Sequence, residues 1–221
     1  MSDIKILDAA WLLSNAEQSP ELFDFADTLD EGGVQAKMTA HGILIIQGTN
    51  QGRDWIDFNL DVFDLTDAEL GNITLVDRSD VRNWHAGFLE YAEVVYGFAN
   101  RFQVKLILGH SLGGAAAQII GAKLQVPTLA FATPRTYRGN GAVPGSQYVL
   151  NVLKSNDRVC NVPPSFKHVG TTIMLEPIRR VNFGEDHRIR HYIRVLEQSP
   201  TYAPRRDVLL SEAVRNPGLY A

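Results

Sequence analysis

The sequence predicts an α/β fold with a central, mostly parallel sheet and flanking helices. Short apolar segments alternate with helical segments through the middle of the chain, as in parallel strands joined by helices. The composition, with 45% hydrophobic and 21% charged residues over 221 positions, excludes disordered, collagen-like and coiled-coil chains. No Pro/Gly/Ser-rich linker divides the sequence, so we expect one domain over residues 1–221.

The first elements expected are a helix and a hairpin. Apolar residues at helical spacing predict a helix over residues 3–16. Residues 34–40 alternate between apolar and polar side chains, and two residues separate them from the apolar run 43–46. This pattern predicts a hairpin at the edge of a larger sheet.

The rest of the chain alternates helices with short apolar strands. Ala-rich and amphipathic stretches favour helices, and short apolar runs favour buried parallel strands. The elements expected are a helix over 86–100, a strand over 104–108, a helix over 112–124, strands over 127–131 and 147–153, and a last helix from near Asp186 through Gln198.

Charge and cysteine content narrow the classes of function. Lys and Arg total 21 against 25 Asp and Glu, a formal charge of −4, so nothing in the net charge points to nucleic acid as a partner. Several arginines gather late in the chain. This cluster indicates a solvated basic face rather than a binding site for anionic head groups. Because Cys160 is the only cysteine, neither an intrachain disulfide nor a cysteine-based zinc site is expected.

Two further features of the sequence concern the location of the protein in the cell. The N-terminus lacks the form of a signal peptide, and no stretch reaches the roughly 18 apolar residues of a membrane span. We therefore expect no transmembrane segment, and a protein that is either cytoplasmic or exported without a standard cleaved signal peptide.

The most informative motif is G-x-S-x-G at residues 109–113, Gly-His-Ser-Leu-Gly. An apolar strand leads into it and an Ala-rich helix leaves it, the context of a nucleophile on a strained strand-to-helix turn. A side chain at either glycine would collide with neighbouring backbone, and the following helix N-terminus offers N–H groups to a developing oxyanion. The motif predicts Ser111 as a nucleophile; the alternative is a glycine-rich helix start without chemistry.

A serine nucleophile needs a base to take its proton and an acid to orient that base. In α/β-hydrolases the order along the chain is serine, then acid, then histidine. The histidines after Ser111 are His168, His187 and His191, so these are the candidate bases.

Seven segments, in order, resemble those of class 3 lipases, the α/β-hydrolase family that includes the fungal triacylglycerol lipases. The resemblance implies the α/β-hydrolase fold over a core of about residues 34–196, with an N-terminal helix and a C-terminal extension. The segments are IIQGTNQGRDWIDFNLD (45–61), WHAGFLEYAEVV (84–95), GHSLGG (109–114), FATPR (131–135), NDRVCNVPP (156–164), FKHVG (166–170) and DHRIRHYIRVL (186–196).

The resemblance also implies roles for the late residues. Asp157 matches the catalytic acid and His187 the catalytic base, whereas His168 matches a structural histidine of the family. We expect Asp186 to cap the last helix and to place His187 in its first turn. His191, four residues after His187, remains an alternative base because it could share the same helical face.

The oxyanion hole and a lid are further expectations. One donor is the backbone N–H of Leu112, the residue after the nucleophile, and by resemblance the second comes from Thr49. The segment 54–63 falls where the family's mobile lid begins. Its apolar side chains either cover the pocket or belong to the core; they are Trp55, Phe58, Leu60 and Phe63.

Together these features predict a serine carboxylester hydrolase, a lipase, that acts on lipid esters through an acyl-enzyme on Ser111. The expected partners are a lipid or other carboxylester substrate and, transiently, a lipid interface; no metal or organic cofactor is expected. The alternatives are a phospholipase of the same fold, acyl transfer to an alcohol other than water, and a non-catalytic scaffold that binds a partner.

Overall fold

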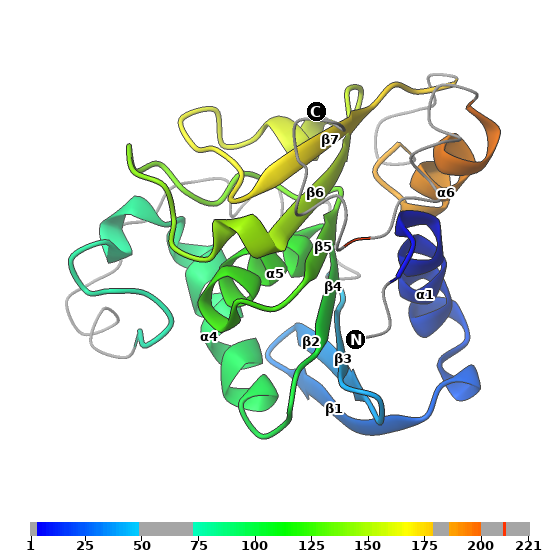
Figure 1. Ribbon diagram of the computed structural model, residues 1–221, viewed down its shortest axis with the longest axis horizontal. Helices are drawn as coiled ribbons and strands as arrows, with labels where there is room; N and C mark the ends of the chain where they lie inside the picture. Colours follow the sequence, from blue (N-terminus) through cyan, green and yellow to red (C-terminus); the bar gives the residue numbers. More distant parts are fainter. Residues whose placement is uncertain (1–3, 49–72, 179–185, 200–209, 211–221) are drawn as a thin grey trace.

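Seven strands form one sheet in the order β1-β2-β3-β4-β5-β6-β7 in the computed structural model (Figure 1). The structure describes residues 4–48, 73–178, 186–199 and 210. The first two neighbouring pairs are antiparallel and the four pairs from β3 to β7 are parallel, so the predicted mostly parallel sheet is confirmed. The strands are β1 Phe25–Glu31, β2 Val34–Thr39, β3 Ile43–Ile46, β4 Leu106–His110, β5 Thr128–Phe131, β6 Val149–Lys154 and β7 Thr171–Leu175.

Helices cover both faces of the sheet, with α4 and α5 on one side and α1 and α6 on the other (Figure 1). The α-helices are α1 Ile6–Gln18, α4 Ala86–Ala99, α5 Leu112–Leu124 and α6 Ile189–Gln198. Short 3-10 helices are η1 Pro20–Leu22, η2 Val81–Asn83, η3 Ser146–Tyr148 and η4 Arg158–Asn161.

The central strands are mostly apolar because both of their faces are buried under helices, with buried polar exceptions such as Asn151 and Lys154 in β6. In β4, Ile107 belongs to the hydrophobic cluster beneath α4 and α5, whereas Leu106 and Leu108 belong to the cluster beneath α1 and α6. Successive side chains of a strand point to opposite faces, so a doubly covered strand has a near-continuous run of apolar residues. This pattern predicted a buried strand over 104–108, and the strand is present with its bounds shifted to Leu106–His110.

Two strands and the start of the last helix differ most from the sequence-based prediction; the other predicted elements are present, with ends shifted by at most three residues. Strands β1 and β7 were not predicted, and β1 rather than the 34–46 hairpin forms the edge of the sheet. Strand β1 carries Asp27, Asp30 and Glu31, residue types that are depleted in strands; they are tolerated here because this edge is largely exposed. The last helix begins at Ile189, not near Asp186.

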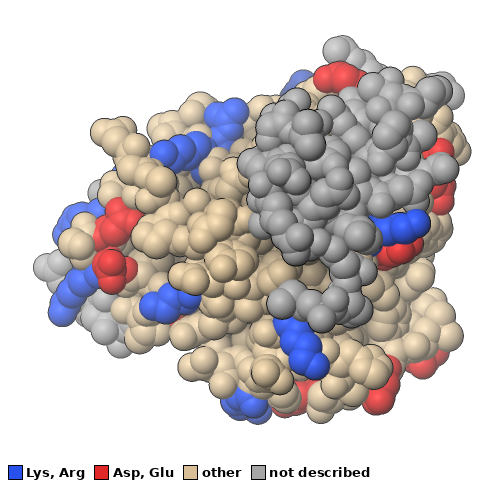
Figure 2. Space-filling view, viewed as in Figure 1, with Lys and Arg blue, Asp and Glu red and all other residues tan. Residues whose placement is uncertain are grey.

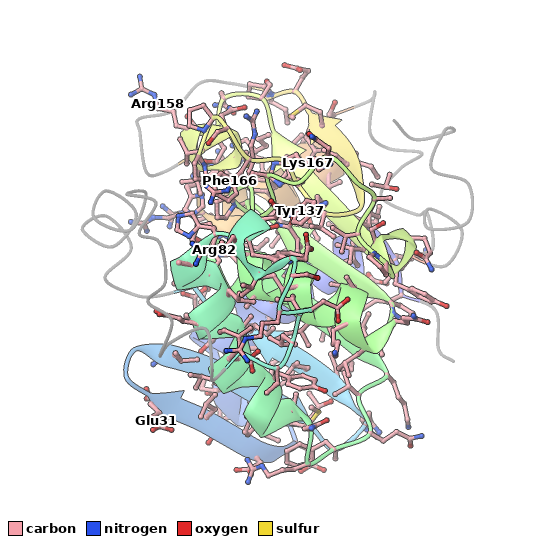
Figure 3. The ribbon with its side chains drawn as sticks, turned by 90° about the vertical axis from the view of Figure 1, so that its left-hand side faces the viewer. Glu31, Arg82, Tyr137, Arg158, Phe166 and Lys167 are labelled. Carbon is pink, nitrogen blue, oxygen red and sulfur yellow. The ribbon has the colours of Figure 1, made fainter. Side chains whose placement is uncertain are left out.

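The connectors that leave β5 and β6 are joined to each other. Tyr137 forms isolated bridges with both Trp84 and Lys167, and the Lys167 ammonium lies 5.3 Å from the centre of the Tyr137 ring. Figure 3 shows Arg82, Tyr137 and Lys167 close together, on the other side of the molecule from Glu31 of β1. These contacts fix the connectors that follow the carboxyl ends of the strands, the end where α/β sheets bind ligands.

No described helix is long and apolar enough to cross a membrane. On the face seen in Figure 2, acidic and basic side chains lie interspersed among uncharged residues over the described surface. The described part of this face therefore carries no broad field of one sign, in keeping with the small net charge of the chain.

Candidate active site

Ser111 lies between the end of β4 and the start of α5, with backbone angles φ 57° and ψ −124°. A positive φ is uncommon for a residue with a side chain and marks local strain. The turn is held on both sides, because Ser111 N donates to Phe131 O over 3.0 Å and Ser111 O accepts from Ala115 N over 3.1 Å. The predicted strand–turn–helix geometry is thus present at this serine.

The two glycines of the motif are required by close packing. A Cβ on Gly109 would overlap the carbonyl oxygen of Gly113, and a Cβ on Gly113 would overlap the carbonyl oxygen of Ile46 in β3. The start of α5 therefore lies directly against the backbone of β3 and β4. This close approach allows Ser111 to project from the turn.

Ser111, His187 and Asp157 form a continuous hydrogen-bonded chain. His187 Nε2 lies 2.7 Å from Ser111 Oγ, and His187 Nδ1 lies 2.9 Å from Asp157 Oδ2. An ionised carboxylate only accepts hydrogen bonds, so Nδ1 carries the ring proton and Nε2 is left to accept the serine O–H. In this tautomer His187 is placed to take a proton from Ser111.

Asp157 is buried, with 2% of its surface exposed. Burial opposes its ionisation, but the hydrogen bond and charge interaction with His187, together with hydrogen bonds from the Tyr192 hydroxyl and Val159 N–H, outweigh it and lower the pKa of Asp157. The neighbouring Arg158 is exposed and points away from the core (Figure 3). Asp157 is therefore ionised at neutral pH and oriented by three donors.

The residues before α6 differ from the prediction. Arg188, not Asp186, is the N-cap of α6, and His187 lies in a turn before the helix. The prediction that Asp186 caps this helix is wrong because Lys154 engages Asp186 instead: its Nζ lies 2.9 Å from Asp186 O and 3.3 Å from Asp186 Oδ1. A lysine is rarely buried, so the sequence carried no signal for this contact.

His110, the second residue of the motif, also contacts the histidine loop. Its Nε2 lies 3.0 Å from the carbonyl oxygen of His187 and must donate, because a carbonyl only accepts. Burial, followed by the charge of His187, lowers the pKa of His110 to about 4. His110 is therefore neutral at physiological pH, and the hydrogen bond fixes its tautomer.

The other late histidines lie elsewhere. His168 Nε2 donates to Cys160 O over 3.0 Å, and burial lowers the pKa of His168 to about 4. His191 lies within α6 and is buried. Of these three histidines, the structure brings only His187 within hydrogen-bonding distance of Ser111 Oγ.

The residues expected around the oxyanion are only partly described. Leu112 begins α5 beside Ser111, and the N–H groups of a first helical turn lack acceptors within the helix. Gly48 lies against the serine, since a Cβ built on it would be 3.0 Å from Ser111 Cβ. Thr49 lies outside the described residues, as do the lid candidates Trp55, Phe58, Leu60 and Phe63.

Metal-ligating side chains do not cluster in the described part of the chain, where no group of three or more His, Cys, Asp or Glu is suited to hold an ion. The carboxylate and imidazole at the site are instead engaged with each other and with Ser111.

The mostly parallel sheet, its flanking helices and a strained serine between β4 and α5 define the class: the chain has an α/β-hydrolase fold. Among solved structures it is similar to the Lip2 lipase of Yarrowia lipolytica, with 18% identity and a TM-score of 0.51 over 68% of this chain and 65% of that one. It is also similar to a triacylglycerol lipase of Penicillium expansum, with 20% identity and a TM-score of 0.51 over 77% and 79% of the two chains.

These similarities confirm the fold that the resemblance to class 3 lipases implied. No family model matches the sequence, and no curated protein sequence matches it. The alignment with the Yarrowia lipase spans 65% of that protein's length. At these identities the similarity concerns the fold alone, and a shared fold does not fix a shared function.

Proposed function

We propose that this protein is a serine carboxylester hydrolase that cleaves lipid esters through an acyl-enzyme on Ser111. The observation that carries the proposal is the hydrogen-bonded chain from Ser111 Oγ through His187 to the buried Asp157. The fold shared with two lipases supports lipid esters as the substrate class. In this proposal the chain acts as one α/β-hydrolase domain.

In the acylation step, His187 Nε2 takes the proton of Ser111 as Oγ attacks the ester carbonyl carbon. The electron pair of the C=O bond moves to oxygen, and Asp157 stabilises the imidazolium that has formed. When the tetrahedral intermediate collapses, the ester C–O bond breaks and His187 gives its proton to the leaving alcohol. The acyl group stays on Ser111.

Deacylation repeats these steps with water as the nucleophile in place of Ser111. His187 takes a proton from water, the hydroxide attacks the acyl carbon, and the proton returns to Ser111 Oγ as the carboxylic acid leaves. The negative oxygen of both intermediates needs about two donors at roughly 3 Å. We assign these to the N–H groups of Leu112 and Thr49; the contact of Gly48 with Ser111 supports the second, since Thr49 follows it in sequence.

The covering role of Trp55, Phe58 and Leu60 belongs to the same proposal. An apolar cover over Ser111 would exclude water from the intermediates and would present apolar surface to a lipid interface. The covering role predicts interfacial activation: the rate of ester hydrolysis should rise when the substrate passes from monomers to aggregates.

A fluorophosphonate probe tests the central step because it reacts with activated serines. We expect labelling at Ser111 that disappears in Ser111→Ala while the circular dichroism spectrum stays unchanged. Ser155→Ala is the matched control, since Ser155 is exposed and its hydroxyl bonds Glu176; this variant should label like the wild type. Labelling that persists in Ser111→Ala would contradict the assignment.

Substrate class is tested by comparing initial rates on p-nitrophenyl esters of increasing chain length with rates on phospholipid vesicles. Faster hydrolysis of longer acyl esters supports a lipase, whereas a preference for vesicles supports a phospholipase. A folded protein that neither labels nor hydrolyses any of these esters would support the non-catalytic scaffold and overturn the proposal.

A further inference from the structure

Lys154 is a buried lysine at the carboxyl end of β6, with only 1% of its surface exposed. Its Nζ lies 2.9 Å from Asp186 O and 3.3 Å from Asp186 Oδ1, and 5.3 Å from the centre of the Tyr192 ring. Lysine is almost never fully buried unless it is paired, and an unpaired buried cation would be very costly. These contacts therefore account for its place in the core.

The same residue touches both segments that flank the candidate site. Lys154 O accepts a hydrogen bond from Asp157 N over 3.1 Å, so Lys154 opens the turn that carries the acid. Its side chain binds Asp186, which directly precedes His187. The Tyr192 ring beside its ammonium group donates its hydroxyl to Asp157. One lysine thus connects the acid turn, the base turn and α6.

The two peptide groups on either side of His187 are both held by side chains. Lys154 Nζ donates to the carbonyl of the preceding residue, Asp186, and His110 Nε2 donates to the carbonyl of His187 itself. Fixing both peptide planes fixes the backbone angles of His187 and so the direction of its Cβ. The hydrogen bond from Lys154 is charge-assisted and therefore the stronger kind.

We propose that Lys154 is a positioning residue of the site: its ammonium group holds the turn that carries His187, so that the imidazole lies between Ser111 Oγ and Asp157 Oδ2. This inference rests on the proposed hydrolysis at Ser111. A catalytic group displaced by about 1 Å can lose about a hundredfold in rate, so the tether acts on kcat more than on substrate binding.

The test has to separate the hydrogen bond from the charge. Removing Lys154 alone would leave the buried Asp186 carboxylate without this cation and destabilise the protein for that reason. Lys154→Met/Asp186→Asn removes both charges together. Lys154→Gln/Asp186→Asn is equally neutral but keeps an N–H donor toward Asp186 O, on a side chain one bond shorter than that of lysine.

A matched control is Lys37→Met. Lys37 Nζ also donates to a main-chain carbonyl, that of Ala16, over 2.7 Å. This contact ties β2 to α1 and involves neither the turn that carries Asp157 nor the turn that carries His187. Lys37→Met therefore reports what a lost lysine–carbonyl bond does to stability alone.

Three measurements are made on each variant: kcat and KM for p-nitrophenyl butyrate, the folded fraction from urea unfolding, and the proton NMR resonance of His187 Nδ1–H bonded to Asp157. With kcat corrected for the folded fraction, we expect Lys154→Met/Asp186→Asn to lose about 10- to 100-fold in kcat with KM within about twofold. Its Nδ1–H resonance should shift upfield or broaden. Lys154→Gln/Asp186→Asn should recover most of the lost kcat and most of the Nδ1–H resonance. Lys37→Met should keep the wild-type kcat and the wild-type resonance.

Wild-type kcat and resonance in the methionine pair, or equal losses in the methionine and glutamine pairs, would overturn the proposal. If the methionine pair does not fold, the glutamine pair decides: near-wild-type kcat and resonance support the tether, and a loss of either overturns it. If the wild type itself neither hydrolyses esters nor labels at Ser111, the proposed function fails. The Nδ1–H resonance still tests the tether in that case, because it needs no turnover.

Discussion

The Tyr192 hydroxyl donates a 2.7 Å hydrogen bond to Asp157 Oδ2, the same oxygen that lies 2.9 Å from His187 Nδ1. Burial, with Cys160 and Asp157 nearby, raises the pKa of Tyr192 well above its usual value. Its hydroxyl therefore stays protonated and serves as a permanent donor to the carboxylate. The contact favours the ionised form of Asp157, the form that the proposed mechanism needs.

Tyr192→Phe should lower kcat about three- to tenfold without changing KM, because the ring still fills its place while Asp157 loses one of its donors. Losing a hydrogen bond to a charged group should also reduce the free energy of unfolding by about 1–3 kcal/mol. Steady-state kinetics and urea unfolding measure the two effects. Tyr96→Phe, on α4, is the control; a Tyr192→Phe variant that matches it in both measurements would refute the expected role.

His187→Ala should reduce kcat by at least about a thousandfold in a protein that stays folded, because the base is lost from both acylation and deacylation. His168→Ala should instead cost about 1–3 kcal/mol of stability, since it leaves Cys160 O without its donor, and should change kcat less than tenfold. Kinetics and circular dichroism on the same preparations distinguish them. The assignment is wrong if His191→Ala proves more damaging to kcat than His187→Ala.

Gly113→Ala should abolish ester hydrolysis and destabilise the protein by more than about 3 kcal/mol, because a Cβ there would overlap the carbonyl oxygen of Ile46. Gly97→Ala is a matched comparison inside α4: it is exposed, and a Cβ there meets nothing within 4 Å. That variant should gain about 0.5–1 kcal/mol from helix propensity. Thermal unfolding of both variants checks the contrast, and equal melting temperatures would contradict the packing argument.

Stability should fall as the pH is lowered from about 6.5 toward 4. The pKa values of His110 and His168 are lowered to about 4 in the folded protein, so within this window the unfolded chain binds more protons than the folded one. Each histidine then costs up to about 1.4 kcal/mol of stability for every pH unit lost. Below this window, Asp157 adds to the loss, because its lowered pKa contributes stability only while it is ionised.

Urea unfolding at pH 7, 6 and 5 measures this slope. His168→Gln keeps a donor for Cys160 O and removes one titrating group. Its free energy of unfolding should therefore change less with pH than that of the wild type, by about the contribution of one histidine. Identical slopes for the wild type and His168→Gln would show that the partly buried His168 does not govern the acid sensitivity.

Much of the fold could be predicted because its central elements carry strong local patterns. The strand, turn and helix around Ser111 were recognised from an apolar run, two glycines and an Ala-rich stretch, and both glycines are sterically required in the structure. Strand β1 could not be recognised in this way, because its acidic residues suit only an exposed edge. Whether a segment lies at an edge depends on which strands pair with it, and that information is not local.

The sequence by itself determined the layered α/β architecture, the strained turn at Ser111 and the order of the candidate acid and base. Periodicity and turn stereochemistry are properties of a few neighbouring residues, so they can be read from the chain directly. Only the tertiary structure decided that Lys154 binds Asp186 and that Tyr192 binds Asp157, across separations of 32 and 35 residues. Such contacts arise where connectors from different strands pack together. Asp186 binds Lys154 in this way and does not cap α6, the role that its sequence position favoured.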